Sequence, residues 1–258
     1  MWDKFGRPPT HLAASETFGS QPEITFWAPP SKSQLLEVTS EWKGVHSRLT
    51  WEELLDVATS LQVKVSHEDI KTSLKGAQAK LAPRPKGGWS AHIDPDPTPF
   101  EQKADTCSPT GRSAFRLAHE FGHIYFSDRR TIPHTPVNSY WHASPYNSAE
   151  EEYCDQLAGL ALVGPEAAHC ETAAEVVYAA QELDVPVAAM INALSVYREH
   201  AAGLFHVPTL GYEPQGPVGF WDAPVLREAV DSCTDGVGFS LRVDGKISSI
   251  ELPSYAAE

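Results

Sequence analysis

The chain has 258 residues, 41% of them hydrophobic, and carries a formal net charge of −14 with histidine neutral. That hydrophobic content suffices for a buried core, so global disorder is excluded, while the negative charge disfavours non-specific binding to a phosphate backbone. No stretch approaches the roughly 18 apolar residues of a membrane span, the first residues lack the apolar core of a signal peptide, and the four cysteines form no CxxC pair. We expect a soluble, cytosolic protein with reduced cysteines and no membrane partner.

The first part of the chain predicts an irregular arm, one helix and a small sheet. Residues 1–49 are polar and contain several prolines, and no catalytic pattern is found in them. Residues 50–60 predict a helix, because Thr50 and Glu53 have the spacing of a capping box. Short apolar or alternating runs predict three strands, at residues 61–67, 76–82 and 88–94.

Two long loops and two long helices are predicted next. Residues 95–111 are rich in proline and predict a loop that contains Cys107, a weak candidate for capping a metal. A helix follows from Gly111 to about Ser127, and residues 128–149 predict a second loop with aromatic residues and histidines. Either loop could act as a lid over a functional site. The next helix is predicted over residues 149–164, where a Gly-Pro pair stops it.

The last part of the chain predicts two short helices and a hairpin. Residues 171–200 predict two helices joined at the segment LDVP, residues 183–186. Further on, two runs with apolar residues flank Asp244-Gly245, a dipeptide typical of a two-residue hairpin turn.

The run AFRLAHEFGHIYF, residues 114–126, contains the pattern HExxH within an otherwise apolar helix. His119 and His123 are four residues apart, so they point the same way, about 6 Å apart along the helix axis, and can reach one ion. Glu120 lies about 100° round the helix and could act as a general base on a water molecule instead. The alternative is a pair of packed or surface histidines, but these polar groups would be costly to bury without a partner. We therefore predict one zinc ion per chain at His119 and His123.

A catalytic zinc site needs a third protein ligand and keeps its fourth position for water. The glutamates Glu150, Glu151 and Glu152 follow on the next predicted helix. Glu151 and Asp155 share one face of it, so Glu151 could bind the metal while Asp155 accepts a hydrogen bond from a histidine ligand. The alternative is an acidic helix start favoured by the helix dipole, and periodicity alone does not separate Glu151 from Glu150.

Together these two segments resemble the ImmA/IrrE-type metallopeptidases. The first, GRSAFRLAHEFGH, matches that family's pattern at Phe115, Leu117, Ala118, His119, Glu120, Gly122 and His123. The second, EEYCDQLAGLALVGP, matches it at Glu151, Cys154, Asp155, Ala158 and Leu162. Arg116 stands where threonine is usual, and Val163-Gly164 replaces the usual Leu-Met before Pro165. Residues 173–199 resemble, more weakly, the helix-turn-helix segment of IrrE-like members.

The resemblance selects Glu151 as the third ligand, in a gluzincin-like His-His-Glu set. It implies an α+β fold with a zincin-like metallopeptidase core, in which a small sheet accompanies the HExxH helix and a second ligand helix. A helical, helix-turn-helix-like segment and a short β-containing tail would follow. The expected division is an N-terminal arm, the metallopeptidase domain, the helix-turn-helix-like segment and the tail, at residues 1–49, 50–170, 171–200 and 201–258.

The resemblance also implies a zinc-dependent protease that cleaves a transcriptional repressor of the XRE helix-turn-helix type in a stress or mobile-element response. Glu120 would take a proton from the attacking water and pass it to the leaving amine. Tyr140 and His142 in the second loop are candidates for steadying the oxyanion, although an ordinary surface position is the better supported alternative for each.

Three other functions stay open at this point. The first is a DNA-binding regulator that uses residues 173–199, but its presumed second helix offers one basic side chain, Arg198, so direct DNA binding is disfavoured. The second is an adaptor with a structural zinc site that a thiol such as Cys107 closes. The third is a metallohydrolase of a non-protein amide, because the motif does not rank a peptide bond against other amides.

Overall fold

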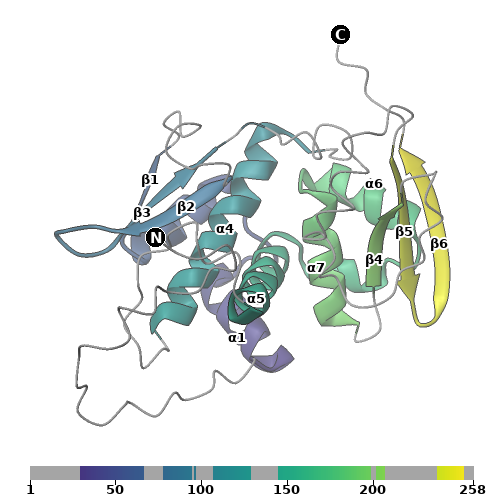
Figure 1. The fold of residues 1–258 in the computed structure, drawn as a ribbon, viewed down its shortest axis with the longest axis horizontal. Coiled ribbons are helices and arrows are strands. Elements are labelled where there is room, and N and C mark those ends of the chain that lie inside the picture. Colours follow the sequence, from purple (N-terminus) through teal and green to yellow (C-terminus); the bar gives the residue numbers. More distant parts are fainter. Residues whose placement is uncertain are drawn as a thin grey trace, which may run out of the picture.

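A computed structural model of the protein shows a mixed α+β structure, in which helices lie between two small sheets (Figure 1). The structure describes residues 30–66, 78–94, 96, 107–128, 145–198, 202–206 and 237–252. The α+β class expected from the sequence is therefore confirmed.

The first sheet contains the three strands predicted from the sequence, in the order β1-β3-β2. Strand β3 (Trp89–Ile93) lies in the middle, parallel to β1 (Val63–Ser66) and antiparallel to β2 (Ala79–Pro83). Ala91 and Ile93 of β3 are completely buried, as expected for alternate residues on the face of a sheet that helices cover.

Helix α2 (Trp51–Ser60) begins at the predicted capping box. The Thr50 hydroxyl accepts a hydrogen bond from the backbone N–H of Glu53, and Oε2 of Glu53 accepts one from the backbone N–H of Thr50 at 2.6 Å. The prediction of this helix and its cap is confirmed. The helix packs against β1 and against the long helix α4.

Helix α1 (Lys32–Lys43) was not predicted, although it begins with a capping box of its own at Ser31 and Gln34. Its apolar pattern is sparse, because only Leu35, Val38 and Thr39 are buried. It packs against α5, so this part of the predicted N-terminal arm belongs to the body of the protein.

The two long helices α4 (Pro109–Asp128) and α5 (Pro145–Leu162) pack against each other in the centre of the structure (Figure 1). Each begins earlier than predicted, so the last five residues of the predicted 128–149 loop are helical. The rest of that loop lies outside the described residues, except Asp128. Helix α5 ends before Gly164-Pro165, as predicted, and a short 3-10 helix, η3 (Pro165–His169), follows.

Helices α6 (Ala173–Leu183) and α7 (Val187–Tyr197) confirm the predicted pair joined at residues 183–186. Helix α7 is buried on nearly all sides. A Cβ atom on Gly159 of α5 would lie 2.7 Å from the carbonyl oxygen of Ala189, so the backbones of α5 and α7 meet closely there. Beyond α7, the guanidinium of Arg198 pairs with Asp244.

The turn between α6 and α7 also touches the start of α4. Asp184 adopts the left-handed conformation, with φ of 53°. Its Oδ1 accepts a hydrogen bond from the backbone N–H of Ser108 at 2.7 Å, and its Oδ2 accepts one from the Ser108 hydroxyl at 2.5 Å. Ser108 in turn accepts a hydrogen bond from the backbone N–H of Gly111 at 3.1 Å. Asp184 therefore supports the cap of α4 from a distant part of the chain.

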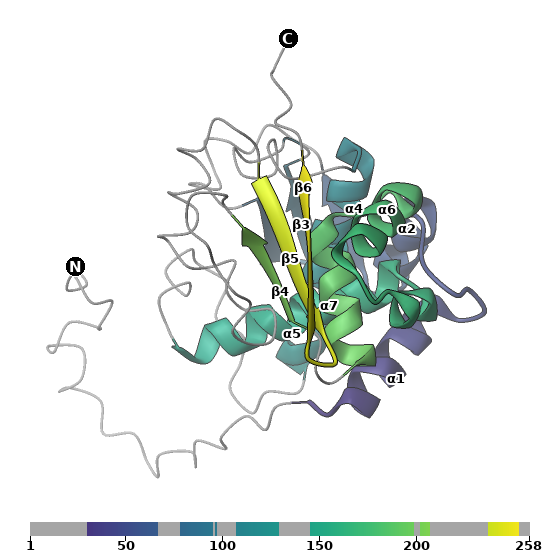
Figure 2. The ribbon, with the colours of Figure 1, turned by 90° about the vertical axis from the view of Figure 1, so that its right-hand side faces the viewer.

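The second sheet is an antiparallel meander that lies beside α6 and α7 (Figure 2). Its strands β5 (Val237–Val243) and β6 (Lys246–Leu252) form the predicted hairpin. The turn residues Asp244 and Gly245 have φ of 50° and 78°, the positive values that a type I′ turn requires. Strand β4 (Ala202–His206) was not predicted and pairs with β5.

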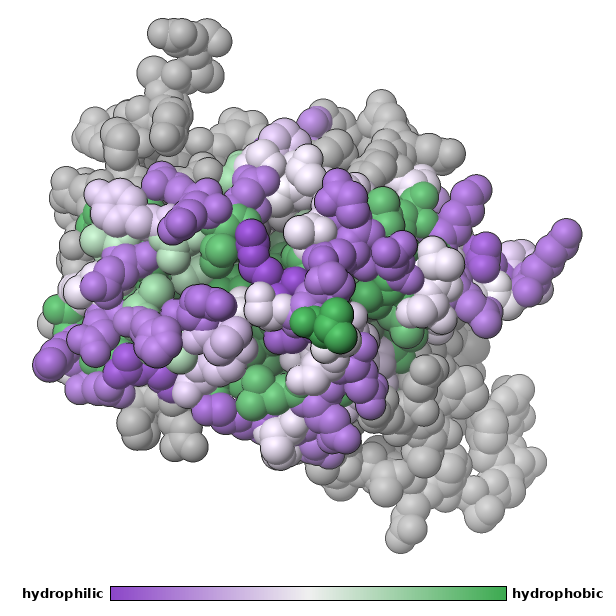
Figure 3. Space-filling view, turned by 180° about the vertical axis from the view of Figure 1, so that it is seen from behind, coloured by the Kyte–Doolittle hydropathy of each residue, from purple (hydrophilic) through white to green (hydrophobic). Residues whose placement is uncertain are grey.

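The surface seen in Figure 3 shows small hydrophobic areas separated by hydrophilic residues. Within the described part of the chain, the large hydrophobic side chains with high exposure are Val45, Tyr178 and Ile247. None of the helices described is long and apolar enough to cross a membrane.

Candidate metal centre

His119 and His123 stand one turn apart on the face of α4 that meets α5. Their ring centroids are 5.0 Å apart, with an angle of 72° between the ring planes. The His119 and His123 side chains are 16% and 6% exposed. Leu117, Ala118 and Phe121 on the same helix are completely buried, so the surrounding core fixes where the two rings can lie.

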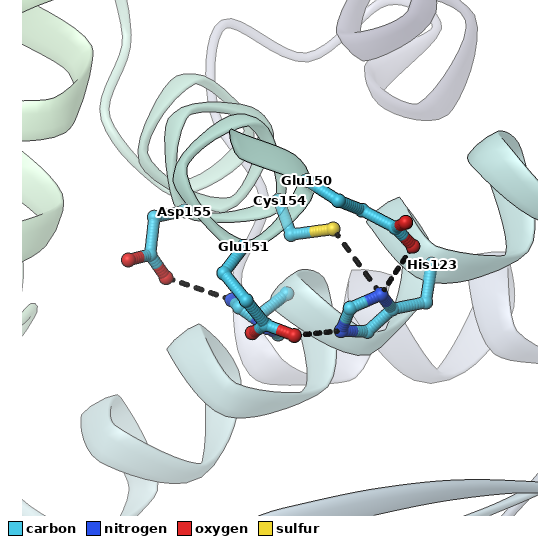
Figure 4. Close-up of polar contacts among 6 residues, drawn as sticks. His123, Glu150, Glu151, Cys154 and Asp155 are labelled. Carbon is cyan, nitrogen blue, oxygen red and sulfur yellow. Dashed lines mark hydrogen bonds and ion pairs between the residues drawn. The ribbon is translucent and has the colours of Figure 1, made fainter. Parts of the chain in front are cut away.

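Helix α5 brings four polar side chains to these rings: Glu150, Glu151, Cys154 and Asp155 (Figure 4). The helices can approach closely because position 122, between the two histidines, is glycine. A Cβ atom on Gly122 would lie 2.8 Å from Sγ of Cys154 and 2.9 Å from its Cα, closer than real Cβ contacts.

The carboxylate of Glu151 lies at the Nε2 atoms of both histidines. Oε2 is 3.0 Å from Nε2 of His119, and Oε1 is 3.5 Å from Nε2 of His123. The structure thus brings together the three residues predicted as metal ligands, and the three meet through the atoms that commonly bind zinc.

The opposite nitrogen of each ring also faces a carboxylate. Nδ1 of His119 is 2.7 Å from Oδ1 of Asp155, and Nδ1 of His123 is 3.0 Å from Oε1 of Glu150. An ionised carboxylate only accepts hydrogen bonds, so a carboxylate at this position would favour the tautomer in which Nδ1 carries the hydrogen and donates it. The contact of Asp155 is the one that its predicted role requires, whereas Glu150 was not predicted as a partner of His123.

The carboxylates around His119 control its charge. Burial by itself lowers the pKa of His119, but the hydrogen bonds and negative charges of Asp155 and Glu151 outweigh burial and raise that pKa well above the ordinary value. The ring can therefore hold a hydrogen on both nitrogens. A divalent cation between Nε2 and Glu151 would take the place of one hydrogen, because an imidazole binds metal through a deprotonated nitrogen.

The acidic start of α5 is not explained by the helix dipole. The sequence placed Glu150, Glu151 and Glu152 in the first turn of a helix, where negative charge is favourable. The helix begins at Pro145, however, so these residues lie beyond the first turn, where that effect has largely faded. Contacts with the histidines account for Glu150 and Glu151 instead.

A second group of donors overlaps the first. His119, His123 and Cys154 each offer a ligand atom within 4.8 Å of the other two, so they are close enough to bind a metal ion. The Cys154 sulfur lies 3.6 Å from Nδ1 of His123, on the same edge of the ring as Glu150. A thiolate is a good zinc ligand, and this sulfur approaches His123 at the Nδ1 edge, whereas Glu151 lies at the Nε2 edge.

The other residues predicted for the site are Glu120, Cys107, Tyr140 and His142. Glu120 follows His119 on α4 and is buried, with 5% exposure. Cys107 is also buried, and its carbonyl oxygen accepts a hydrogen bond from Arg112 at 2.9 Å. The donor group of His119, His123 and Cys154 contains neither Cys107 nor the predicted third ligand, Glu151. Tyr140 and His142, the two oxyanion candidates, lie outside the described residues.

Comparisons of the chain with protein-family models, curated proteins and solved structures find no match. The centre consists of two imidazoles, a carboxylate near both of their Nε2 atoms, and a carboxylate at each Nδ1.

Proposed function

We propose that the protein is a zinc metalloprotease whose ligands are His119, His123 and Glu151 and whose general base is Glu120. The observation that carries this proposal is the position of the Glu151 carboxylate between the two Nε2 atoms. Three ligands of this kind leave one position open, as in catalytic zinc sites, whereas structural sites are usually closed by four protein ligands.

Zinc at this point would lower the pKa of a water molecule to about 7 and polarise a substrate carbonyl. The chain supplies the rest. Glu120 is buried beside the histidines in sequence and accepts a proton from the attacking water on its carboxylate. It then delivers that proton to the nitrogen of the leaving amine. Asp155 holds His119 through Nδ1 and so keeps Nε2 directed at the ligand position.

The fold around the site supports a zincin-like assignment. Helix α4 carries HExxH and packs against β2 and β3, and α5 supplies the third ligand from a separate helix. Together with the sequence patterns at residues 111–123 and 151–165, this arrangement supports membership of the ImmA/IrrE-type metallopeptidases. Helices α6 and α7 would then correspond to the helix-turn-helix-like segment of that family. Their role would be to pack against the core or to dock the repressor.

For the substrate we propose a transcriptional repressor of the XRE helix-turn-helix type, cleaved in the cytosol in a stress or mobile-element response. The resemblance supplies this class. The charge of the chain, −14, is compatible with it, because DNA-binding proteins are commonly basic and opposite charges speed encounter.

Two of the other functions meet specific observations. DNA binding through the second helix of the pair is disfavoured because α7 is buried and Arg198 pairs with Asp244. A structural zinc site is favoured by one feature, the Cys154 thiol near His123, which could supply a fourth protein ligand. We prefer the catalytic assignment because this thiol approaches His123 at Nδ1 and not at Nε2, where Glu151 lies.

The decisive experiment uses the full chain, loaded with zinc, and a repressor encoded beside it. Cleavage is followed by mass spectrometry with and without a chelator. We expect fragments that a chelator abolishes and that the Glu120→Gln variant does not produce, although this variant keeps one zinc per chain. The Glu152→Gln variant is the control, because Glu152 is a neighbouring glutamate that contacts Gln156. Full activity of Glu120→Gln would refute the mechanism, and a chain that binds no zinc would refute the site.

A further inference from the structure

We infer that Glu150 is a positioning residue that reserves Nε2 of His123 for the metal and keeps Cys154 out of the ligand set. The inference rests on the proposed function and concerns the side of His123 that faces away from the metal position.

His123 lies between two carboxylates on adjacent residues of α5. Oε1 of Glu150 is 3.0 Å from Nδ1, and Oε1 of Glu151 is 3.5 Å from Nε2. Adjacent residues on a helix diverge by about 100°, so they can hold both edges of one ring only where the ring sits between them. Figure 4 shows His123 in this position, with Glu150 and Glu151 on different edges.

Burial makes the contact of Glu150 strong. The Glu150 side chain is 11% exposed and that of His123 is 6% exposed, so neither has much access to water as an alternative partner. A hydrogen bond to a charged group in such surroundings is stronger than one between neutral groups at the surface. Glu150 therefore keeps the hydrogen on Nδ1, and the lone pair of the neutral imidazole is on Nε2.

The nitrogen of His123 that carries the hydrogen decides which third donor can join the two histidines, Glu151 or Cys154. Cys154 lies 3.6 Å from Nδ1 of His123, so its thiol could most directly join a metal that His123 binds through Nδ1. With Nδ1 protonated and hydrogen-bonded to Glu150, that edge offers no lone pair. The metal is then held at the Nε2 edge, where Glu151 lies, and its fourth position stays free of the thiol.

Metal affinity tests this role without reference to proteolysis. In a competition titration against a chromophoric chelator, Glu150→Ala should bind zinc about 10–100-fold more weakly than the wild type, the range for loss of such a supporting partner. Glu150→Gln keeps a neutral acceptor and should fall between the two. Glu152→Ala is the matched control and should bind like the wild type, since no hydrogen bond between described residues joins Glu152 to either histidine. Circular dichroism and thermal unfolding establish that each variant is folded.

Cobalt in place of zinc reports on the thiol, because a cobalt–thiolate bond absorbs in the near ultraviolet and a cobalt–imidazole bond does not. The wild type should lack this absorption. Equal zinc affinities of folded Glu150→Ala and Glu152→Ala, or a thiolate band in the cobalt-loaded wild type that Cys154→Ala removes, would overturn the inference. Failure of the wild type to bind any metal would instead refute the proposed function, and the role of Glu150 with it.

Discussion

Gly122 on α4 lies against Cys154 on α5 with no room for a side chain between them, because a Cβ atom at position 122 would be 2.8 Å from Sγ and 2.9 Å from Cα of Cys154. The contact occurs between the two histidines in sequence, so it sets the distance between the helix that carries them and the helix that carries Glu151. Overpacking of a core costs about 1–3 kcal/mol of stability, and here it would also separate the ligands.

We therefore expect Gly122→Ala to lower both the free energy of unfolding and the zinc affinity. Gly159→Ala is a matched control, because its Cβ atom would lie 2.7 Å from the Ala189 carbonyl oxygen, at the α5–α7 contact. It should destabilise the protein while its zinc affinity stays near that of the wild type. If both variants bound zinc as well as the wild type, the α4–α5 contact would not control the ligand geometry.

The Cys154→Ala variant distinguishes the two donor groups at the site. If Glu151 is the third ligand, this variant still binds one zinc per chain and still cleaves the substrate. Its stability should fall by about 1 kcal/mol, because a completely buried sulfur is lost. Metal content measured by mass spectrometry is the readout, and Glu151→Gln is the comparison that should lose the metal. The reverse pattern in these two variants would establish the His-His-Cys set.

Metal removal should destabilise the protein. A ligand that binds only the folded state adds about 2.7 kcal/mol to the free energy of unfolding when its concentration is 100 times its dissociation constant. We expect the melting temperature of the zinc-loaded protein to fall on addition of a chelator and to recover when zinc is restored in excess. The His119→Ala, His123→Ala double variant should show no response to either addition. A chelator effect of the same size in that variant would place the metal elsewhere.

The capping box of α2 should give a small stability contribution that depends on pH. The hydrogen bond from the backbone N–H of Thr50 lowers the pKa of Glu53 below the ordinary value of 4.5, although burial partly opposes this. Since the folded-state pKa is the lower one, the contribution is complete above the unfolded value and is lost as pH falls through the folded value.

Glu53→Ala should therefore cost about 0.5 kcal/mol near neutral pH, a modest effect because the side chain is only partly buried, and progressively less in acid. Gln34→Ala deletes the equivalent residue of the uncharged capping box of α1, so its cost should not follow this trend. Thermal unfolding at neutral and acidic pH measures both. A constant difference between Glu53→Ala and the wild type across the range would contradict the assignment.

Asp184 should stabilise the start of α4. Asp184→Ala removes both acceptors for Ser108 and places an alanine at φ of 53°, where L-residues other than asparagine and aspartate are strained. We expect a loss of about 1–2 kcal/mol from the missing capping partner. Asp184→Asn keeps one acceptor and tolerates the conformation, so it should lose less. Chemical denaturation of the two variants gives the comparison, and a negligible loss in Asp184→Ala would show that the hydrogen bonds contribute little.

The sequence predicted much of this centre because two of its key spacings are local to a helix. The four-residue spacing places His119 and His123 on one face of α4, and the same spacing places Glu151 and Asp155 on one face of α5. The contact of Glu150 was not predicted because it depends on how α5 is rotated about its axis relative to α4. This rotation is set by tertiary packing and cannot be inferred from residue spacing within one helix. The first sheet, the helix pair and the hairpin had clear patterns, whereas α1 has too few buried residues to stand out and β4, with the sequence AGLFH, contains a glycine and no alternation of apolar and polar residues.

The close approach of α5 and α7 at Gly159 limits how the protein could be divided into modules. The sequence suggested a boundary between residues 170 and 171, but a fragment that ended there would lose the helix that covers α5 and the aspartate that supports the first turn of α4. The apolar surface that such a fragment newly exposes would favour aggregation over independent folding. We therefore expect α4 and α5 to need the segment that contains α6 and α7 in order to fold, so that moving these two helices to another scaffold would require this segment as well.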